Sequence, residues 1–127
     1  MDSESFRILR ILVPIDGSPN AKRALNAAIN LSKIYGSELV VLNVIPTPSI
    51  LVEAPVSLGM APSSLESYYE QQEMDANHFI DEAMSVVKVQ GAVKTRSKVS
   101  RAAKSIVEEI IETAVHEKID LIIIGTR

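Results

Sequence analysis

The sequence predicts an α/β fold, a doubly wound three-layer sandwich with a parallel sheet. Near-continuous apolar runs, typical of strands covered on both faces, alternate with segments whose apolar residues recur every three or four positions, the spacing of a helix face. Strand and helix follow one another with no internal repeat and no linker, which is the order of a doubly wound sheet. The 127 residues are 46% apolar and 23% charged, which predicts one domain, residues 1–127, around one core.

The first strand and helix are clearly marked. Residues 8–13 read Ile-Leu-Arg-Ile-Leu-Val, and apolar residues from Ala21 to Tyr35 keep the spacing of a helix face. Ser18 is suited to the N-cap, Pro19 to the first helical position, and Gly36 to the left-handed conformation that ends a helix. These signals predict a capped helix directly after the first strand.

The second strand is predicted at residues 39–44, which read Leu-Val-Val-Leu-Asn-Val. A helical crossover of this length makes the first two strands parallel. Residues 46–62 are rich in Pro and Ser, which predicts a surface loop. The second helix then begins at Ser63, where Glu66 can complete a capping box, and its apolar face continues up to Gly91.

The third strand, residues 92–99, differs because apolar or small residues alternate with Lys and Arg, a polar pattern that suits a sheet edge. A third helix carries apolar residues over 103–115, and the Leu-Ile-Ile-Ile run at 121–124 is the fourth strand. The strand order 3-2-1-4 with right-handed crossovers puts the polar strand at an edge. In this Rossmann-like sheet of flavodoxin-like order, the switch point lies between the first and fourth strands, and ligands bind there.

Asp16 and Gly125 follow the two strands that flank the switch point. Asp16 can accept hydrogen bonds from sugar hydroxyls or approach a phosphate-bound cation. Its alternative role is structural, to cap the first helix or fix the turn. Gly125 lets the backbone turn with no side chain in the way, so that peptide N–H groups can face an anion, and its alternative role is a simple turn.

Three segments together resemble the universal stress protein family. They read Val-Pro-Ile-Asp-Gly-Ser-Pro-Asn-Ala at residues 13–21, Val-Leu-Asn-Val at 41–44, and Ile-Asp-Leu-Ile-Ile-Ile-Gly-Thr-Arg at 119–127. The resemblance runs from about Arg10 to the last residue and is weakest in the loop and the second helix. Each segment alone is weak, whereas the set is specific.

The resemblance is to the ATP-binding branch of that family, in which the aspartate after the first strand contacts the nucleotide. Backbone at the end of the second strand recognises adenine in that branch, and a Gly after the fourth strand opens the phosphate loop. The binding residues that the resemblance implies here are Pro14, Ile15, Asp16, Val44, Ile124, Gly125, Thr126 and Arg127. It implies ATP as the ligand, with Mg²⁺ as a companion ion.

The family's phosphate loop continues with a second Gly and a later Gly-Ser pair, beyond Arg127. We therefore expect those glycines, a fourth helix and the fifth strand to be missing. Residues 121–124 would then form an exposed apolar edge that a missing segment or a partner chain covers. Family members commonly dimerise through the final strand, so the resemblance implies a homodimer for the complete protein. Ser100 and Ala102, where the family often has Gly and Pro, are smaller departures.

The leading hypothesis is a stress-response regulatory protein that binds an adenine nucleotide, ATP or AMP, with weak or no hydrolysis, because no general base or phosphate-polarising lysine can be named. The alternative is a stress-protein interaction or dimerisation module that binds no nucleotide. A third, an enzyme acting on a nucleotide, rests only on the general fold.

Composition argues against other classes of function. The net charge of −3 gives no reason to expect nucleic acid as a partner, and no run is long enough for a membrane span. The short polar start is unlike a signal peptide, which predicts a cytoplasmic protein. His78 and His116 have no companion at ligand spacing, so no metal site is expected. The Gly-rich phosphate motifs and the Gly-x-Ser-x-Gly elbow do not occur.

Overall fold

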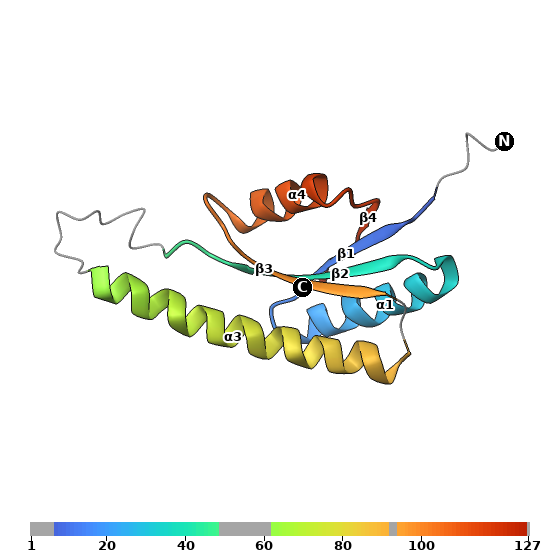
Figure 1. Ribbon diagram of the computed structural model, residues 1–127, viewed down its shortest axis with the longest axis horizontal. Coiled ribbons are helices and arrows are strands. Elements are labelled where there is room, and N and C mark those ends of the chain that lie inside the picture. Colours follow the sequence, from blue (N-terminus) through green and yellow to red (C-terminus); the bar gives the residue numbers. More distant parts are fainter. Residues whose placement is uncertain (1–6, 49–61, 92–93, 127) are drawn as a thin grey trace.

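The computed structural model describes residues 7–48, 62–91 and 94–126. Its strands and helices follow one another in the predicted alternation (Figure 1). The elements are β1 (Arg10–Pro14), α1 (Pro19–Tyr35), β2 (Glu38–Ile45), α3 (Pro62–Val89), β3 (Thr95–Arg101), α4 (Ile106–His116) and β4 (Leu121–Ile122).

One four-stranded sheet runs through the molecule in the order β3-β2-β1-β4, and all its strand pairs are parallel. This confirms the predicted strand order. The sheet is the middle of three layers, with α1 and α3 on one face and α4 on the other (Figure 1). Because all strands run the same way, their carboxyl ends meet at one edge of the sheet, where the ligand site was predicted.

Helix α1 has the predicted caps. The Ser18 side chain accepts a hydrogen bond from the Ala21 N–H, Pro19 opens the helix, and Gly36 takes the left-handed conformation with φ 67°. A non-glycine residue would be strained there, because its Cβ crowds the backbone at positive φ. The cap therefore fixes where the chain turns into β2.

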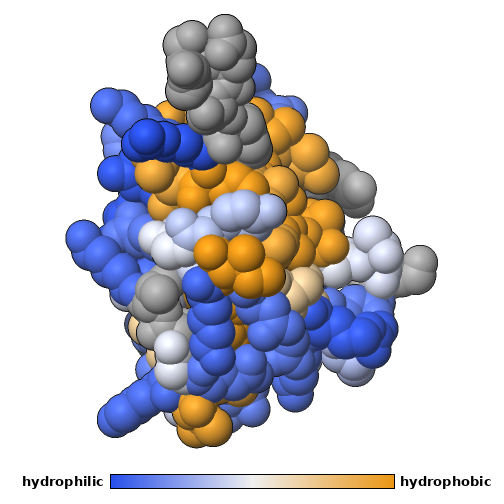
Figure 2. All heavy atoms as spheres, turned by 90° about the vertical axis from the view of Figure 1, so that its right-hand side faces the viewer, coloured by the Kyte–Doolittle hydropathy of each residue, from blue (hydrophilic) through white to orange (hydrophobic). Residues whose placement is uncertain are grey.

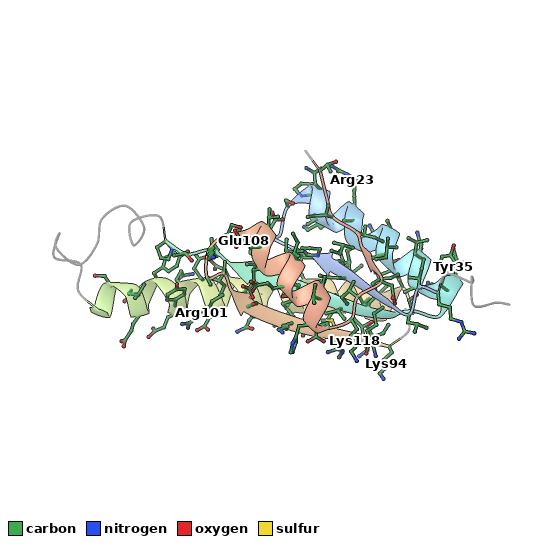
Figure 3. The ribbon with its side chains drawn as sticks, turned by 90° about the horizontal axis from the view of Figure 1, so that it is seen from above. Arg23, Tyr35, Lys94, Arg101, Glu108 and Lys118 are labelled. Atoms are coloured by element: carbon green, nitrogen blue, oxygen red, sulfur yellow. The ribbon has the colours of Figure 1, made fainter. Side chains whose placement is uncertain are left out.

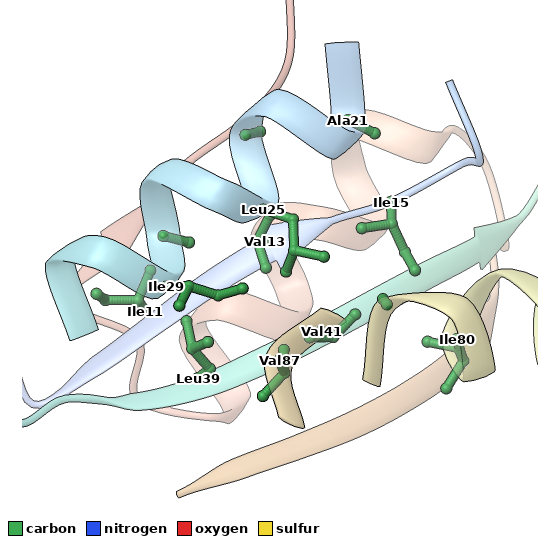
Figure 4. Close-up of a cluster of buried hydrophobic side chains, with 13 residues drawn as sticks. Ile11, Val13, Ile15, Ala21, Leu25, Ile29, Leu39, Val41, Ile80 and Val87 are labelled. Atoms are coloured by element: carbon green, nitrogen blue, oxygen red, sulfur yellow. The ribbon is translucent and has the colours of Figure 1, made fainter. Parts of the chain in front are cut away.

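Two groups of buried side chains flank the sheet because successive strand residues point to opposite faces. Ile11 and Val13 of β1 belong to the larger group, which packs against α1 and α3 (Figure 4). Leu12 belongs to the smaller group, under α4, together with Val40, Leu42 and Ile110. The larger group consists of Ile11, Val13, Ile15, Ala21, Ala24, Leu25, Ala28, Ile29, Leu39, Val41, Ile80, Ala83 and Val87.

The two edge strands differ from their predicted bounds. Strand β3 is a largely exposed edge, as predicted, but it continues to Arg101 and pairs with β2 as far as Ile45. Strand β4 is Leu121–Ile122, the two residues in register with β1, although the apolar run continues to Ile124 and the Ile123 N–H still donates to the Leu12 carbonyl. The predicted start of the third strand, residues 92–93, lies outside the described residues.

The helix boundaries also differ slightly from the predicted ones. Helix α3 begins at Pro62, and the Ser63 side chain of the predicted capping box is not among those described. Helix α4 begins at Ile106, after the Ser105 N-cap, whose hydroxyl accepts a hydrogen bond from the Glu108 N–H. Within the described ranges, none of the helices carries an apolar stretch long enough to span a bilayer.

Candidate functional site

The carboxyl end of β1 is held in place by β2. The Ile15 N–H donates to the Leu42 carbonyl at 2.8 Å, and the Asn43 side-chain amide donates to the Ile15 carbonyl at 2.7 Å. Asn43 is 7% exposed, so its amide has little access to water and its bond to Ile15 is sheltered. The chain therefore leaves the sheet at Asp16 from a fixed point.

Asp16 sits in the turn between β1 and α1 and is exposed. Its carboxylate accepts a hydrogen bond from the Ser18 N–H at 2.9 Å, while the Ser18 hydroxyl caps the helix. The predicted structural role, fixing the turn, is therefore present. A carboxylate beside a helix N-terminus is also stabilised by the unpaired N–H groups there. The turn orients the Asp16 side chain at the carboxyl edge of the sheet.

Gly125 approaches the first turn of α1. A Cβ on Gly125 would lie 2.5 Å from the Asn20 carbonyl oxygen and 2.9 Å from the Ala21 nitrogen. Its φ is not positive, unlike that of Gly17, so backbone conformation is not what requires glycine here. What requires glycine at this position is the absence of a side chain, because only glycine lets the chain after β4 lie this close to α1.

A cleft of about 190 Å³ opens where these segments meet. It brings together Pro14, Ile15, Asp16, Val44, Ile124 and Gly125 of the predicted binding residues. Thr126 is exposed and is not part of the lining, and Arg127 lies outside the described residues. The tips of β1 and β4 thus open into one crevice.

The remaining lining residues were not predicted. They are Ser18, Ala21, Ile106 and Ile110. Ile106 and Ile110 are four residues apart on α4, so they share one helix face, and Ile110 is buried against the sheet. The apolar spacing in the sequence predicts this helix face, but it does not show that the face reaches the carboxyl ends of the strands.

The cleft combines aliphatic walls with one acid. Among the described residues that line it, Asp16 is the only titratable side chain. Such a site can enclose a flat apolar group and accept hydrogen bonds from hydroxyls at its rim. No group of three or more His, Asp or Glu in the described ranges is arranged to hold a metal ion.

Charged side chains gather at the opposite, amino end of the sheet. Glu38 pairs with Arg10 and with Arg96, each at 3.2 Å, and Arg96 pairs with Glu117 at 2.7 Å. The side chains of Glu38 and Glu117 are only 14% and 15% exposed. These pairs join β1, β2 and β3 to the residue that follows α4.

The ion pairs shift the pKa of each acid. Burial raises the pKa of Glu38, but hydrogen bonds and charge from Arg96, with a further bond from Arg10, outweigh it, so the net pKa lies below 4.5. The hydrogen bond from Arg96 lowers the pKa of Glu117. The same bond raises the pKa of Arg96. At the same end of the sheet, the Asp120 carboxylate accepts hydrogen bonds from the backbone N–H groups of Leu9 and Arg10, at 2.8 and 3.0 Å.

The chain is similar to known proteins over nearly its whole length. The model of the universal stress protein family matches residues 8–127. The universal stress protein YxiE of Bacillus subtilis is 27% identical over 130 residues, which cover 93% of this chain and 78% of that protein.

Solved structures share the fold. A protein of the universal stress protein family from Burkholderia pseudomallei is 26% identical, with a TM-score of 0.71 over 94% of this chain and 82% of that one. A family protein from Arabidopsis thaliana with AMP bound has a TM-score of 0.64 over 93% of this chain and 76% of that one. At 12% identity, the second likeness concerns the fold alone.

Proposed function

This chain belongs to the universal stress protein family, and from that premise we propose that the cleft at the tips of β1 and β4 binds an adenine nucleotide, ATP or AMP. The observation that carries the proposal is that one crevice is lined by the Asp16 carboxylate, by Gly125 and by aliphatic side chains. Such crevices at the carboxyl ends of parallel strands are where open α/β sheets bind ligands. The Arabidopsis protein with AMP bound is an example of this fold holding an adenine nucleotide.

The size of the cleft limits how much of the nucleotide it encloses. Its volume of about 190 Å³ is below the roughly 300–1,000 Å³ typical of sites that bury a drug-sized ligand. We therefore assign the base and sugar to the cleft and leave the phosphates at its solvent side. AMP and ATP should then bind through the same contacts of the described residues.

Each part of the lining has a role in the proposal. Val44, Ile110 and Ile124 offer aliphatic surface to the faces of the adenine ring. Asp16 accepts hydrogen bonds from the sugar hydroxyls, and such bonds to a charged acceptor are the stronger kind. The backbone around Gly125 and the N-terminus of α1 lie beside the cleft, and helix N-termini attract phosphate groups.

We assign a regulatory rather than a catalytic role to the bound nucleotide. Mg²⁺ is usually held by one or two carboxylates together with substrate phosphates, and Asp16 is the carboxylate that the described lining offers. Hydrolysis also needs a group that positions or deprotonates water. Because the described lining offers no other titratable group, we expect phosphate release to be slow or absent.

Calorimetric titration with AMP, and with ATP and Mg²⁺, tests the proposal. The variant Asp16→Asn keeps an acceptor for the Ser18 N–H but removes the charge, whereas Asp16→Ala removes both. We expect the affinity for AMP to fall about tenfold in each variant, equivalent to about 1.4 kcal/mol. Asp81→Asn, an exposed aspartate on α3, is the matched control. Wild-type affinity in both Asp16 variants would show that Asp16 does not bind the nucleotide.

An apolar surface favours a second function, association between two copies of the chain. On α4, Val107, Ile111 and Val115 are 64%, 53% and 74% exposed, and on the β4 segment Ile122 and Ile124 are 39% and 54% exposed. Apolar side chains gather in the upper half of Figure 2, the half in which Figure 1 places α4 and β4. In the view from above, strand β1 can be seen beside helix α4 (Figure 3). Contiguous apolar surface of this kind marks interaction sites.

We propose that this α4–β4 surface forms a homodimer interface. Sedimentation of the wild type should show a dimer, and Ile111→Glu should shift it to monomer, because a charge in an apolar interface is costly. Ile34→Glu introduces the same charge at a side chain on α1 that is 71% exposed, and it should leave the dimer intact. A monomeric wild type would contradict the dimer but not the nucleotide site.

A further inference from the structure

A second cavity lies between α1 and α3, on the face of the sheet opposite α4. Its volume is about 350 Å³, and its lining comes mainly from these two helices. Ile15 and Ala21 reach both this groove and the cleft, but the other lining residues differ. We call this cavity the α1–α3 groove. The side chains that define its wall and rim are Lys22, Leu25, Phe79, Glu82, Ala83 and Val86.

The groove is bounded at both ends. At one end Phe79 of α3 packs on Gly17, where a Cβ would lie 2.4 Å from the phenyl ring. At the other end the side-chain amide of Gln90 donates to the Asn26 side chain at 2.8 Å and ties α3 to α1. About ten residues of helix separate these ends, a rise of roughly 15 Å. A groove of this length and volume suits a small molecule better than a helix.

The walls are apolar and the rim is charged. Leu25 and Ala83 are buried in the wall, and Val86 is 37% exposed above them. Glu82 at the rim lies 3.8 Å from the His78 imidazole on the same helix. Lys22, on the opposite helix, is exposed and forms no ion pair with any carboxylate of the described residues. The rim therefore offers a cation to a ligand, next to apolar surface.

We propose that the α1–α3 groove binds a small amphipathic monocarboxylate, with its apolar body against Leu25, Ala83 and Val86 and its carboxylate paired with Lys22. The volume falls within the range of ligand sites, which combine apolar lining with a few polar groups that fix orientation. A carboxylate at Lys22 forms a charge-assisted hydrogen bond, while burial of the body removes apolar surface from water. The groove shares Ile15 and Ala21 with the proposed nucleotide cleft, but the residues assigned here to the ligand line the groove alone.

Titration with decanoate, followed by amide chemical shifts, tests the site on the whole chain. Decan-1-ol serves as the uncharged comparison, and both are kept below the concentration at which they aggregate. We expect saturable shifts at Gly17, Lys22 and Ser85, which line the groove. Lys22→Met keeps the aliphatic stem, so decanoate affinity should fall about tenfold while that of decan-1-ol stays within about twofold.

Two controls make the outcome decisive. Lys33→Met removes an exposed lysine of α1 that does not line the groove, and it should leave both affinities unchanged. Val86→Trp fills the groove from its exposed rim and should abolish binding of both ligands. Equal losses in Lys22→Met and Lys33→Met, or shifts confined to Ile122 and Ile124 on the α4–β4 surface, would overturn the proposal. An unchanged far-UV dichroism spectrum excludes ligand-induced unfolding as the cause of the shifts.

Discussion

The two ends of the sheet use their polar side chains differently. At the amino end, Arg96 of β3 pairs with Glu38 of β2 and with Glu117, the residue after α4. At the carboxyl end, the side-chain bond from Asn43 to Ile15 holds the strand tips, and Asp16 is turned to an open cleft. The amino end is joined by ion pairs, whereas the carboxyl end holds a cleft beside a buried amide and a close-packed glycine.

This difference shows how one sheet supplies both a rigid base and a binding edge. Strand starts are fixed by contacts between residues far apart in the sequence, such as Asp120 with the Arg10 N–H. With the starts fixed, the loops at the other end can differ in sequence without loss of the strand register. The comparison predicts that substitutions at the carboxyl end change binding, whereas those at the amino end change only stability.

The largest effect is expected for Gly125→Val. The new side chain would meet the Asn20 carbonyl, which belongs to the α1 backbone and cannot move aside alone. We expect a loss of about 3 kcal/mol in the free energy of unfolding, the upper part of the range for overpacking, together with loss of measurable AMP binding. Denaturant unfolding and calorimetry measure the two effects.

Thr126→Val is the matched control for Gly125→Val. Thr126 is the next residue, exposed and outside the cleft lining, so its substitution should change stability by less than about 0.5 kcal/mol. If both variants bind AMP as the wild type does, the close approach of Gly125 to α1 is not needed for the cleft.

A smaller effect is expected for Asn43→Leu, which keeps a side chain of similar size but removes the amide. The Ile15 carbonyl then loses its partner in a place with little access to water, at a cost of about 2 kcal/mol. Because Ile15 lines the cleft, AMP affinity should fall as well. Asn30→Ala, an exposed asparagine of α1, should change neither quantity. A stability loss with unchanged affinity would limit Asn43 to a structural role.

The fold was predictable because its signals are local. Ser18, Pro19 and Gly36 act within one or two turns of α1, and the apolar runs show which strands are covered. The end of β4 was not predictable in this way. Its apolar run continues past Ile122, and which of its residues pair with β1 depends on the register of two segments about 110 residues apart.

The candidate site was predicted in part for the same reason. The turn at Asp16 and the glycine at 125 follow strands directly, so the sequence places them at the switch point. Ile106 lines the cleft because of how α4 is placed over the sheet, which no local pattern in the sequence specifies. Asn43 carried a usable signal, since an amide within an otherwise apolar strand must find a buried partner.

The smallest effect in the comparison is expected at the amino end, for Glu117→Gln. The variant keeps the backbone bond from the Glu117 N–H to the Thr113 carbonyl but loses the charge that pairs with Arg96 and Lys98. We expect a loss of about 1 kcal/mol at pH 7, the upper part of the range for pairs near the surface, with no change in AMP affinity. Glu112→Gln, an exposed glutamate of α4, is the matched control.

The pH dependence of that loss identifies its cause. Arg96 lowers the pKa of Glu117 in the folded protein, so the unfolded chain takes up a proton first as the pH falls. The stability from this pair is therefore fully present above the ordinary value of 4.5 and disappears as the pH falls through the lowered, folded-state pKa. The difference between the wild type and Glu117→Gln should stay constant from about pH 7 to 5 and shrink toward pH 3. A difference that persists at pH 3 would mean that packing of the side chain, and not its charge, closes the amino end.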